Sequence, residues 1–315
     1  MGRKLLCMVM TVLLVCLCAG CGPQDKTAAS GRQVTDALGR TVTVPAAPQR
    51  VVALSTSLVD LTAAVQGDLM GRSSVRAVDA SVPKGYEDVP EMGPVYSVNM
   101  EKVLAVQPDL VLVSATQQSK LVPVLEQNGI AVLALKTKTY DEVRHTLDLL
   151  GTVYGHQAEA RDALQSMEQR LTQIKGALPA EKPRIAILHA TAKSVTLELP
   201  HSIAGSTADI LGLPNIAAEV TEQTGADMET VPLSLEFLTA QNPDILFVTS
   251  MGKADQIEAR LQEDLAANPA WSNLKAVQTG RVYILPENLF LLSPGVHYPD
   301  AAAYMAEKAF PGLSL

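Results

Sequence analysis

The sequence predicts an α/β protein of two lobes, each built on a central parallel sheet, with a single long α-helix joining them. Three observations lead to this fold class. Short apolar runs alternate with helical segments of about ten residues, a rhythm typical of parallel βαβ units. The stretch SVNMEKVLAVQPDLVLVSA at 97–115 recurs as PLSLEFLTAQNPDILFVTS at 232–250, so each lobe is expected to repeat one architecture. Between the repeats, residues 139–176 lose the strand pattern and become helical.

The first residues have the pattern of a secretory signal peptide, expected over 1–20. Arg3 and Lys4 precede an apolar run that ends in small residues. The run is too short and too one-sided to be interpreted first as a transmembrane helix.

Cys21 is the expected lipidation site. All four cysteines lie within the first 21 residues, so no disulfide framework is expected in the body. The segment LCAGC resembles the bacterial lipobox, although Cys18 stands where leucine is usual; the alternative is an ordinary cleavage site with an incidental cysteine. The chain is therefore expected to be exported and lipid-anchored to the cell membrane, facing the periplasm or the cell exterior.

Composition limits the classes of function. Aromatic residues make up 4% and charged residues 18% of the chain, without low-complexity tracts, so a packed globular body is expected. The formal net charge of -8 argues against nucleic acid as a partner. We expect a monomer.

The first lobe is expected over 34–155, after a flexible tether at 21–33 that is small, polar and unpatterned. Its predicted elements are a hairpin around Leu38-Gly39, strands at 50–54, 109–114 and 130–135, and helices at 58–66 (capped by Ser57), 101–107, 119–129 and 139–155.

The connecting helix is expected over 156–178, where apolar residues recur at a spacing of three and four. The second lobe then covers 179–315. Its predicted strands are 184–188, 195–199, 244–250 and 281–285, and its predicted helices are 202–213, 234–241, 255–268 and 298–310.

Four segments in this order and spacing carry a resemblance to a known family: DALGRTVTVPAAPQRVVAL, MGPVYSVNMEKVLAVQPDLVLVS, NPAWSNLKAVQTGRVYILP and the SPG at 293–295. From about Val34 to Leu313 the chain resembles the solute-binding proteins of ABC importers for iron–siderophores, haem and cobalamin. The resemblance implies two Rossmann-like lobes, a rigid connecting helix and only a small closing motion. It also implies that a metal chelate binds between the lobes and is delivered to a permease driven by a cytoplasmic ATPase. No enzyme activity, cofactor or metal site of the protein's own is expected.

Glu101 and Glu236 occupy matching positions in the repeated stretch. Asn99 and Ser234 are suitable N-cap residues, so each glutamate would lie in the first turn of a helix, where the macrodipole favours an acid. The resemblance implies a second role, because family members dock on permease arginines through one exposed glutamate of each lobe.

Ligand-binding candidates were taken from the loops that follow the carboxyl ends of strands, where doubly wound sheets bind ligands. These loops are rich in hydroxyl and amide groups and would suit a large, partly apolar ligand with many acceptors. The candidates are Ser55, Thr56, Tyr96, Thr116, His189, Thr249, Phe290 and His297.

Several alternatives stay open among these candidates. Tyr96 could equally be a loop aromatic packed on its own lobe, and His189 and His297 could be surface or packed histidines. Haem-binding relatives carry a tyrosine about seven residues before the docking glutamate, where this chain has Pro94, so haem is not specifically indicated. The candidate loops lack arginine, which favours a neutral chelate or a corrinoid over a strongly anionic catecholate.

Two other classes of function compete. No G-x-S-x-G, P-loop, G-x-G-x-x-G or H-E-x-x-H motif indicates an enzyme. A tethered ligand-sensing or surface-binding module, not coupled to transport, is the remaining alternative, and paired docking glutamates would have no use in it.

Overall fold

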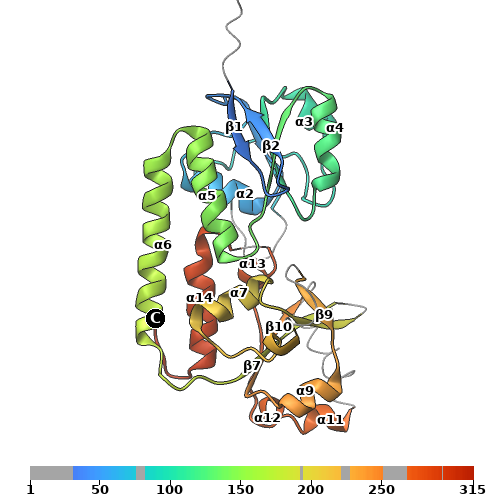
Figure 1. The fold of residues 1–315 in the computed structure, drawn as a ribbon, viewed down its shortest axis with the longest axis vertical. Helices are drawn as coiled ribbons and strands as arrows, with labels where there is room; N and C mark the ends of the chain where they lie inside the picture. The colour runs from blue at the N-terminus through green and yellow to red at the C-terminus, as the bar shows by residue number, and fades with distance from the viewer. Residues whose placement is uncertain (1–30, 76–81, 192–193, 221–227, 251–267, 293) are drawn as a thin grey trace, which may run out of the picture.

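The computed structural model describes residues 31–75, 82–191, 194–220, 228–250, 268–292 and 294–315. They form two α/β lobes, and α6 (Gln157–Ala177) runs along one side of the molecule from one lobe to the other (Figure 1). This confirms the predicted fold class. The predicted signal peptide, Cys21 and nearly all of the helix predicted at 255–268 lie outside the described residues.

The first lobe is built on a parallel sheet. Its strands lie in the order β4-β3-β5-β6, with bounds β3 Val51–Ala53, β4 Gly71–Arg72, β5 Leu110–Ser114 and β6 Ala131–Leu135. The apolar runs of β3 and β5 are buried along almost their whole length, as expected for strands that are covered by helices on both faces.

Helices of the first lobe follow the strands as predicted, with one difference at a cap. They are α2 Thr56–Ala64, α3 Met100–Ala105, a 3₁₀ turn at Ser119–Leu121 and α4 Val122–Gln127. The N-cap of α2 is Ser55, whose backbone is extended and whose side chain accepts from Leu58 N at 3.4 Å. The prediction of Ser57 as the cap was wrong, because Ser57 already lies inside the helix.

A separate hairpin precedes the first sheet. It pairs β1 (Arg32–Thr35) with β2 (Thr41–Val44) in antiparallel register across the predicted Leu38-Gly39 turn. The strand begins at Arg32, inside the segment predicted as tether, because Arg32 pairs with Val44. Asp36 fixes the turn by accepting from Leu38 N and Arg40 N, both at 3.0 Å.

Two helices lead from the first lobe to the second. α5 (Tyr140–Tyr154) starts with a capping box between Thr139 and Glu142, and Gly155, at φ 76°, ends it in the left-handed conformation. The long α6 follows, and its buried residues are Ala160, Met167, Leu171 and Ile174. None of the helices that the structure describes combines the length and the apolar character needed to span a bilayer.

The second lobe has a mixed sheet. Its strands lie in the order β11-β10-β7-β8-β9, with bounds β7 Ile185–Ala190, β8 Val195–Glu198, β9 Thr230–Pro232, β10 Ile245–Ser250 and β11 Val282–Ile284. β11, β10 and β7 are parallel, whereas β8 and β9 are antiparallel to their neighbours. The turn between β7 and β8 is too short for a crossover, so β8 returns as a hairpin.

Helices and short turns complete the second lobe. They are α7 Ile203–Leu211, α9 Leu235–Gln241, α11 Pro269–Ser272, α12 Lys275–Gln278, α13 Glu287–Phe290, a 3₁₀ turn η3 at Gly295–His297, and α14 Tyr298–Ala309. The hydrophobic core of the first lobe takes in Ile203 and Tyr298 from the second lobe, so the two lobes share packed side chains.

The repeated Pro-Asp pair performs the same task in each lobe. Asp109 accepts from Arg50 N at 3.0 Å at the start of β3, and Asp244 accepts from Arg184 N at 2.9 Å at the start of β7. Each aspartate therefore ties the start of its own strand to the start of the neighbouring strand in the sheet. This shared role explains why the Pro-Asp pair occurs in both repeats.

Candidate ligand-binding cleft

A cleft between the lobes holds most of the predicted ligand-binding residues. It consists of two adjoining hollows that are open to solvent, with cavity volumes of about 40 Å³ and about 160 Å³. Gln117, Lys138 and Leu291 line both hollows, which makes them continuous.

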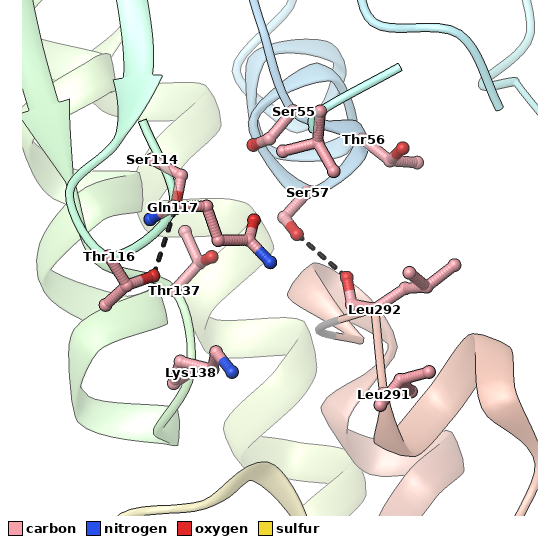
Figure 2. Close-up of a pocket in the computed structure, with 11 residues that line it drawn as sticks. Ser55, Thr56, Ser57, Ser114, Thr116, Gln117, Thr137, Lys138, Leu291 and Leu292 are labelled. Atoms are coloured by element: carbon pink, nitrogen blue, oxygen red, sulfur yellow. Dashed lines mark hydrogen bonds between the residues drawn. The ribbon is translucent and has the colours of Figure 1, made fainter. Parts of the chain in front are cut away.

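Hydroxyl groups dominate the first hollow, where the first lobe faces Leu291 and Leu292 of the second (Figure 2). Its first-lobe lining residues are Ser55, Thr56, Ser57, Val95, Ser114, Thr116, Gln117, Thr137 and Lys138. Most of them end or follow β3, β5 and β6, or belong to the first turn of α2, whereas Val95 lies in the segment between β4 and α3. The rule for parallel sheets explains why segments so far apart in sequence meet here.

Gln118 fixes the shape of this wall although it does not line the hollow. Its side-chain amide donates to Leu54 O at 2.8 Å and to Val95 O at 3.0 Å, and its Oε1 accepts from Ser114 N at 3.0 Å. The side chain is buried, with 2% of the residue exposed. One amide therefore ties three loops of the first lobe together.

The second hollow lies on the side of the second lobe. Its lining residues are Tyr96, Gln117, Lys138, His189, Glu198, Ser202, Ile203, Glu229, Thr230, Phe290 and Leu291. Tyr96 is 69% exposed, and its hydroxyl accepts from Gln117 Nε2 at 2.9 Å. Tyr96 therefore extends over the cleft instead of packing into its own lobe.

His189 is oriented by buried groups behind it. Its Nδ1 lies 2.9 Å from Thr249 Oγ1 and 3.6 Å from Glu198 Oε1. Thr249 donates its single hydroxyl proton to Glu198, so Nδ1–H of His189 donates to Thr249. This tautomer leaves Nε2 of His189 as an acceptor.

An ion pair crosses the second hollow. Lys138 of the first lobe and Glu229 of the second lobe lie 2.8 Å apart, Nζ to Oε2. The Lys138 carbonyl also accepts from the Tyr298 hydroxyl, and Ser57 Oγ donates to Leu292 O at 3.0 Å. These contacts connect the lobes around the cleft.

Six of the eight predicted ligand-binding residues line the cleft: Ser55, Thr56, Tyr96, Thr116, His189 and Phe290. Thr249 and His297 do not line either hollow. Thr249 is 1% exposed and supports His189 from behind.

His297 points to a different contact. Its Nδ1 pairs with Asp300 Oδ2 at 3.0 Å, and this hydrogen bond raises the pKa of the imidazole while burial opposes the shift. With 59% of its side chain exposed, His297 corresponds to the surface-histidine alternative.

Three charged lining residues were missed in the sequence. Lys138 was predictable, because its loop follows the carboxyl end of β6, yet that loop was not considered. Glu198 and Glu229 reach the cleft through the antiparallel strands β8 and β9, whose direction the parallel pattern did not indicate.

The two repeated glutamates are exposed and lie in first helical turns, as predicted. Asn99 Oδ1 accepts from Lys102 N at 3.0 Å at the start of α3, and Ser234 Oγ accepts from Phe237 N at 3.2 Å at the start of α9. α3 and α9 lie at opposite ends of the molecule, on the side away from α6 (Figure 1). Neither Glu101 nor Glu236 lines the cleft.

Chemically, the cleft offers hydroxyl, amide and ammonium donors from one lobe and carboxylate and imidazole groups from the other. Among the described residues, no three histidine, cysteine or acidic side chains are grouped so as to hold a metal ion. The arrangement is suited to binding a polar small molecule through many hydrogen bonds.

Comparison with known proteins agrees with this architecture. The sequence profile of the family "Periplasmic binding protein" matches residues 51–289. The Fe(3+)-citrate-binding protein YfmC of Bacillus subtilis is 26% identical over 320 residues, which cover 96% of each chain. The putative ABC transporter substrate-binding lipoprotein YhfQ of the same organism is 24% identical, with 98% of each chain covered. The fold is also that of Staphylococcus aureus IsdE complexed with heme, with a TM-score of 0.72, 21% identity, and coverage of 83% of this chain and 98% of that one.

Two lobes around a cleft, with one connecting helix, are the architecture of a class of binding proteins. The chain belongs to the periplasmic binding protein family. This confirms the resemblance derived from the sequence, and members of the family are substrate-binding proteins.

Proposed function

We propose that this protein is the substrate-binding component of an ABC importer and captures a metal chelate in the cleft between its lobes. The observation that carries the proposal is the cleft itself, where hydroxyl and amide groups from separate strand ends converge on two adjoining hollows between the lobes. Such groups donate hydrogen bonds to the oxygens that surround a chelated metal.

The class of ligand is supported by the relatives. A protein that is 26% identical over nearly the whole chain binds Fe(3+)-citrate, and a structural neighbour of the same fold carries heme. We therefore place the ligand among ferric siderophores, ferric carboxylates and haem, with a corrinoid as a further option to test.

Delivery to a permease is the second part of the proposal. Glu101 and Glu236 are exposed, lie outside the cleft and stand at corresponding positions of the two lobes. Carboxylates so placed are available to pair with cationic groups of a permease. An anchor at Cys21 would keep the protein at the membrane, as the lipoprotein name of YhfQ suggests.

Charge reversal at both glutamates tests this function. In cells that depend on this chain, Glu101→Arg/Glu236→Arg should reduce uptake of ⁵⁵Fe supplied as the bound chelate at least about ten-fold, because like charges would then face the permease. The dissociation constant of the purified soluble form for the same chelate should stay within about two-fold, because neither glutamate touches the cleft.

A matched double variant, Asp162→Arg/Glu307→Arg, places the same charges at exposed positions on α6 and α14. It should transport as the wild type does. Normal uptake by Glu101→Arg/Glu236→Arg would refute the docking role and favour a tethered sensing module. Failure of the wild type to bind ferric citrate, haemin, a ferric trihydroxamate or cobalamin would refute the capture of a chelate.

A further inference from the structure

The Lys138–Glu229 ion pair lies inside the cleft and not on an outer surface. Both residues line the second hollow, and Lys138 lines the first hollow as well. The two side chains are 25% and 39% exposed, so each is within reach of solvent and of an entering ligand. Ion pairs with this degree of exposure contribute little stability, so a ligand can replace one partner at small cost.

The backbone on both sides of this pair is fixed, which leaves the side chains as the exchangeable parts. Lys138 N donates to Glu142 Oε2 at 2.8 Å, and the Lys138 carbonyl accepts from the Tyr298 hydroxyl. The Glu229 carbonyl accepts from Leu199 N at 2.8 Å, next to the register pair of Glu198 with Thr230.

The two walls of the cleft differ in charge. The first-lobe wall presents Lys138 and hydroxyl groups near the N-terminal end of α2. The second-lobe wall presents Glu229 and Glu198, and Glu198 is 5% exposed. The described lining residues thus include two carboxylates and one ammonium group. Each charge acts across a partly desolvated space, where electrostatic attraction is stronger than in water.

An entering ligand could replace either member of the ion pair. An anionic group that displaced Glu229 from Lys138 would then face both carboxylates. A cationic group that displaced Lys138 would be attracted by both, and the Lys138 ammonium could turn toward the hydroxyl groups of the first hollow. The two carboxylates of the second-lobe wall favour the second exchange.

We propose that the cleft selects a metal chelate that carries a cationic group, with Glu229 as the residue that recognises this group. In the empty cleft the Lys138 ammonium takes the place of the ligand's cation. The oxygens of the chelate lie against the hydroxyl-rich wall of the first lobe, and its ammonium or guanidinium group lies against Glu229 and Glu198. This inference rests on the proposed function and specifies the chemical class of the ligand.

Two probes that differ by one charge test the proposal. Ferrioxamine B is a ferric trihydroxamate with a terminal ammonium group, and its N-acetylated form has the same iron core without that charge. By isothermal titration of the soluble form, the ammonium probe should bind at least about ten-fold more tightly, a difference of about 1.4 kcal/mol. Glu229→Gln should reduce the difference to less than about three-fold, mainly by weakening the ammonium probe. The control Glu307→Gln, an exposed glutamate on α14, should leave it unchanged.

Lys138→Met gives an independent readout with the opposite sign. The variant removes the Lys138 ammonium that competes with the ligand for Glu229, so binding of the ammonium probe should strengthen about two- to ten-fold. If Lys138 instead served to bind an anionic ligand, the same variant would weaken the binding of ferric citrate. Thermal unfolding of each variant establishes that it is folded before titration.

Ferric citrate and haemin, titrated in parallel, separate this inference from the proposed function. Two results would overturn the choice of a cationic ligand while supporting capture of a chelate. One is equal affinity for the two ferrioxamines. The other is tight binding of ferric citrate that Glu229→Gln strengthens and Lys138→Met weakens. Absence of binding by every probe would overturn both.

Discussion

At the scale of single residues, Gln118 shows how one buried amide shapes a ligand-binding wall. It pairs with two carbonyls that lie 64 and 23 residues away in the chain, Leu54 O and Val95 O, and with Ser114 N at the end of the preceding strand β5. Polar groups buried without partners are costly, so this side chain holds the loops in one arrangement. Thr116 was predicted at the cleft, but no local pattern distinguished Gln118, because the two carbonyls to which it donates lie 64 and 23 residues away in the chain.

Replacing Gln118 by leucine should therefore weaken both stability and binding. Gln118→Leu keeps the volume but leaves Leu54 O, Val95 O and Ser114 N unpaired, which should lower the free energy of unfolding by about 2–4 kcal/mol. Urea denaturation measures the change. The same substitution at Gln127, an exposed residue of α4, should change it by less than about 0.5 kcal/mol. Equal effects at the two positions would contradict a bridging role for Gln118.

At the scale of elements, α2 and η3 form a contact between the lobes that responds to pH. Asp60 of α2 lies beside η3, where a Cβ added at Gly295 would be 3.7 Å from Asp60 Cβ. Burial raises the pKa of Asp60 from 3.8 to about 7, and the charge of His297 opposes the shift. A carboxyl group with a raised folded pKa holds its proton more tightly in the folded state. The favourable contribution of Asp60 to the free energy of unfolding is fully present below the unfolded pKa of 3.8, and it is lost as the pH rises through the folded pKa of about 7.

Asp60→Asn should consequently stabilise the protein by an amount that grows as the pH rises from 3.8 to about 7 and is then constant. At pH 8.5 the variant avoids a buried carboxylate, and its free energy of unfolding should exceed that of the wild type by about 2 kcal/mol. Below the unfolded pKa of 3.8, Asp60 is protonated in both the folded and the unfolded state, so at about pH 3.5 the two proteins should be nearly equal. Asp148→Asn, at an exposed position of α5, is the control and should show no such dependence. A difference that is the same at both pH values would mean that Asp60 does not titrate near neutrality.

The repeated segments also belong to this scale, and here the sequence was most informative. The helix–strand units at α3–β5 and α9–β10 were predictable, because each combines an N-cap residue, a helical turn and a Pro-Asp pair before an apolar run. Gln107 and Asn242, which precede the two prolines, both adopt positive φ, at 45° and 41°. This shared geometry ends each helix at the same point, since the residue before proline disfavours the helical region.

At the scale of the whole molecule, the order of elements and the connecting helix were predictable, whereas the chemistry of the cleft was only partly so. Periodicity and strand ends indicated the hydroxyl-rich wall. The positions of Glu198 and Glu229 in the cleft depend on β8 and β9. The antiparallel pairing of these strands is set by contacts across the sheet and by a short hairpin. The Lys138–Glu229 pair joins residues 91 positions apart, and no local pattern predicts such a contact.

The position of a bound metal tests the account most directly. Crystals of the soluble form loaded with the ferric chelate that it binds should show one iron peak in anomalous difference maps collected at the iron edge. We expect this peak between the lobes, with the oxygens of the chelate against Ser57, Thr116 and Gln117 and the remainder of the ligand toward Glu229. An iron peak outside this cleft, on one lobe alone, would contradict the proposed site.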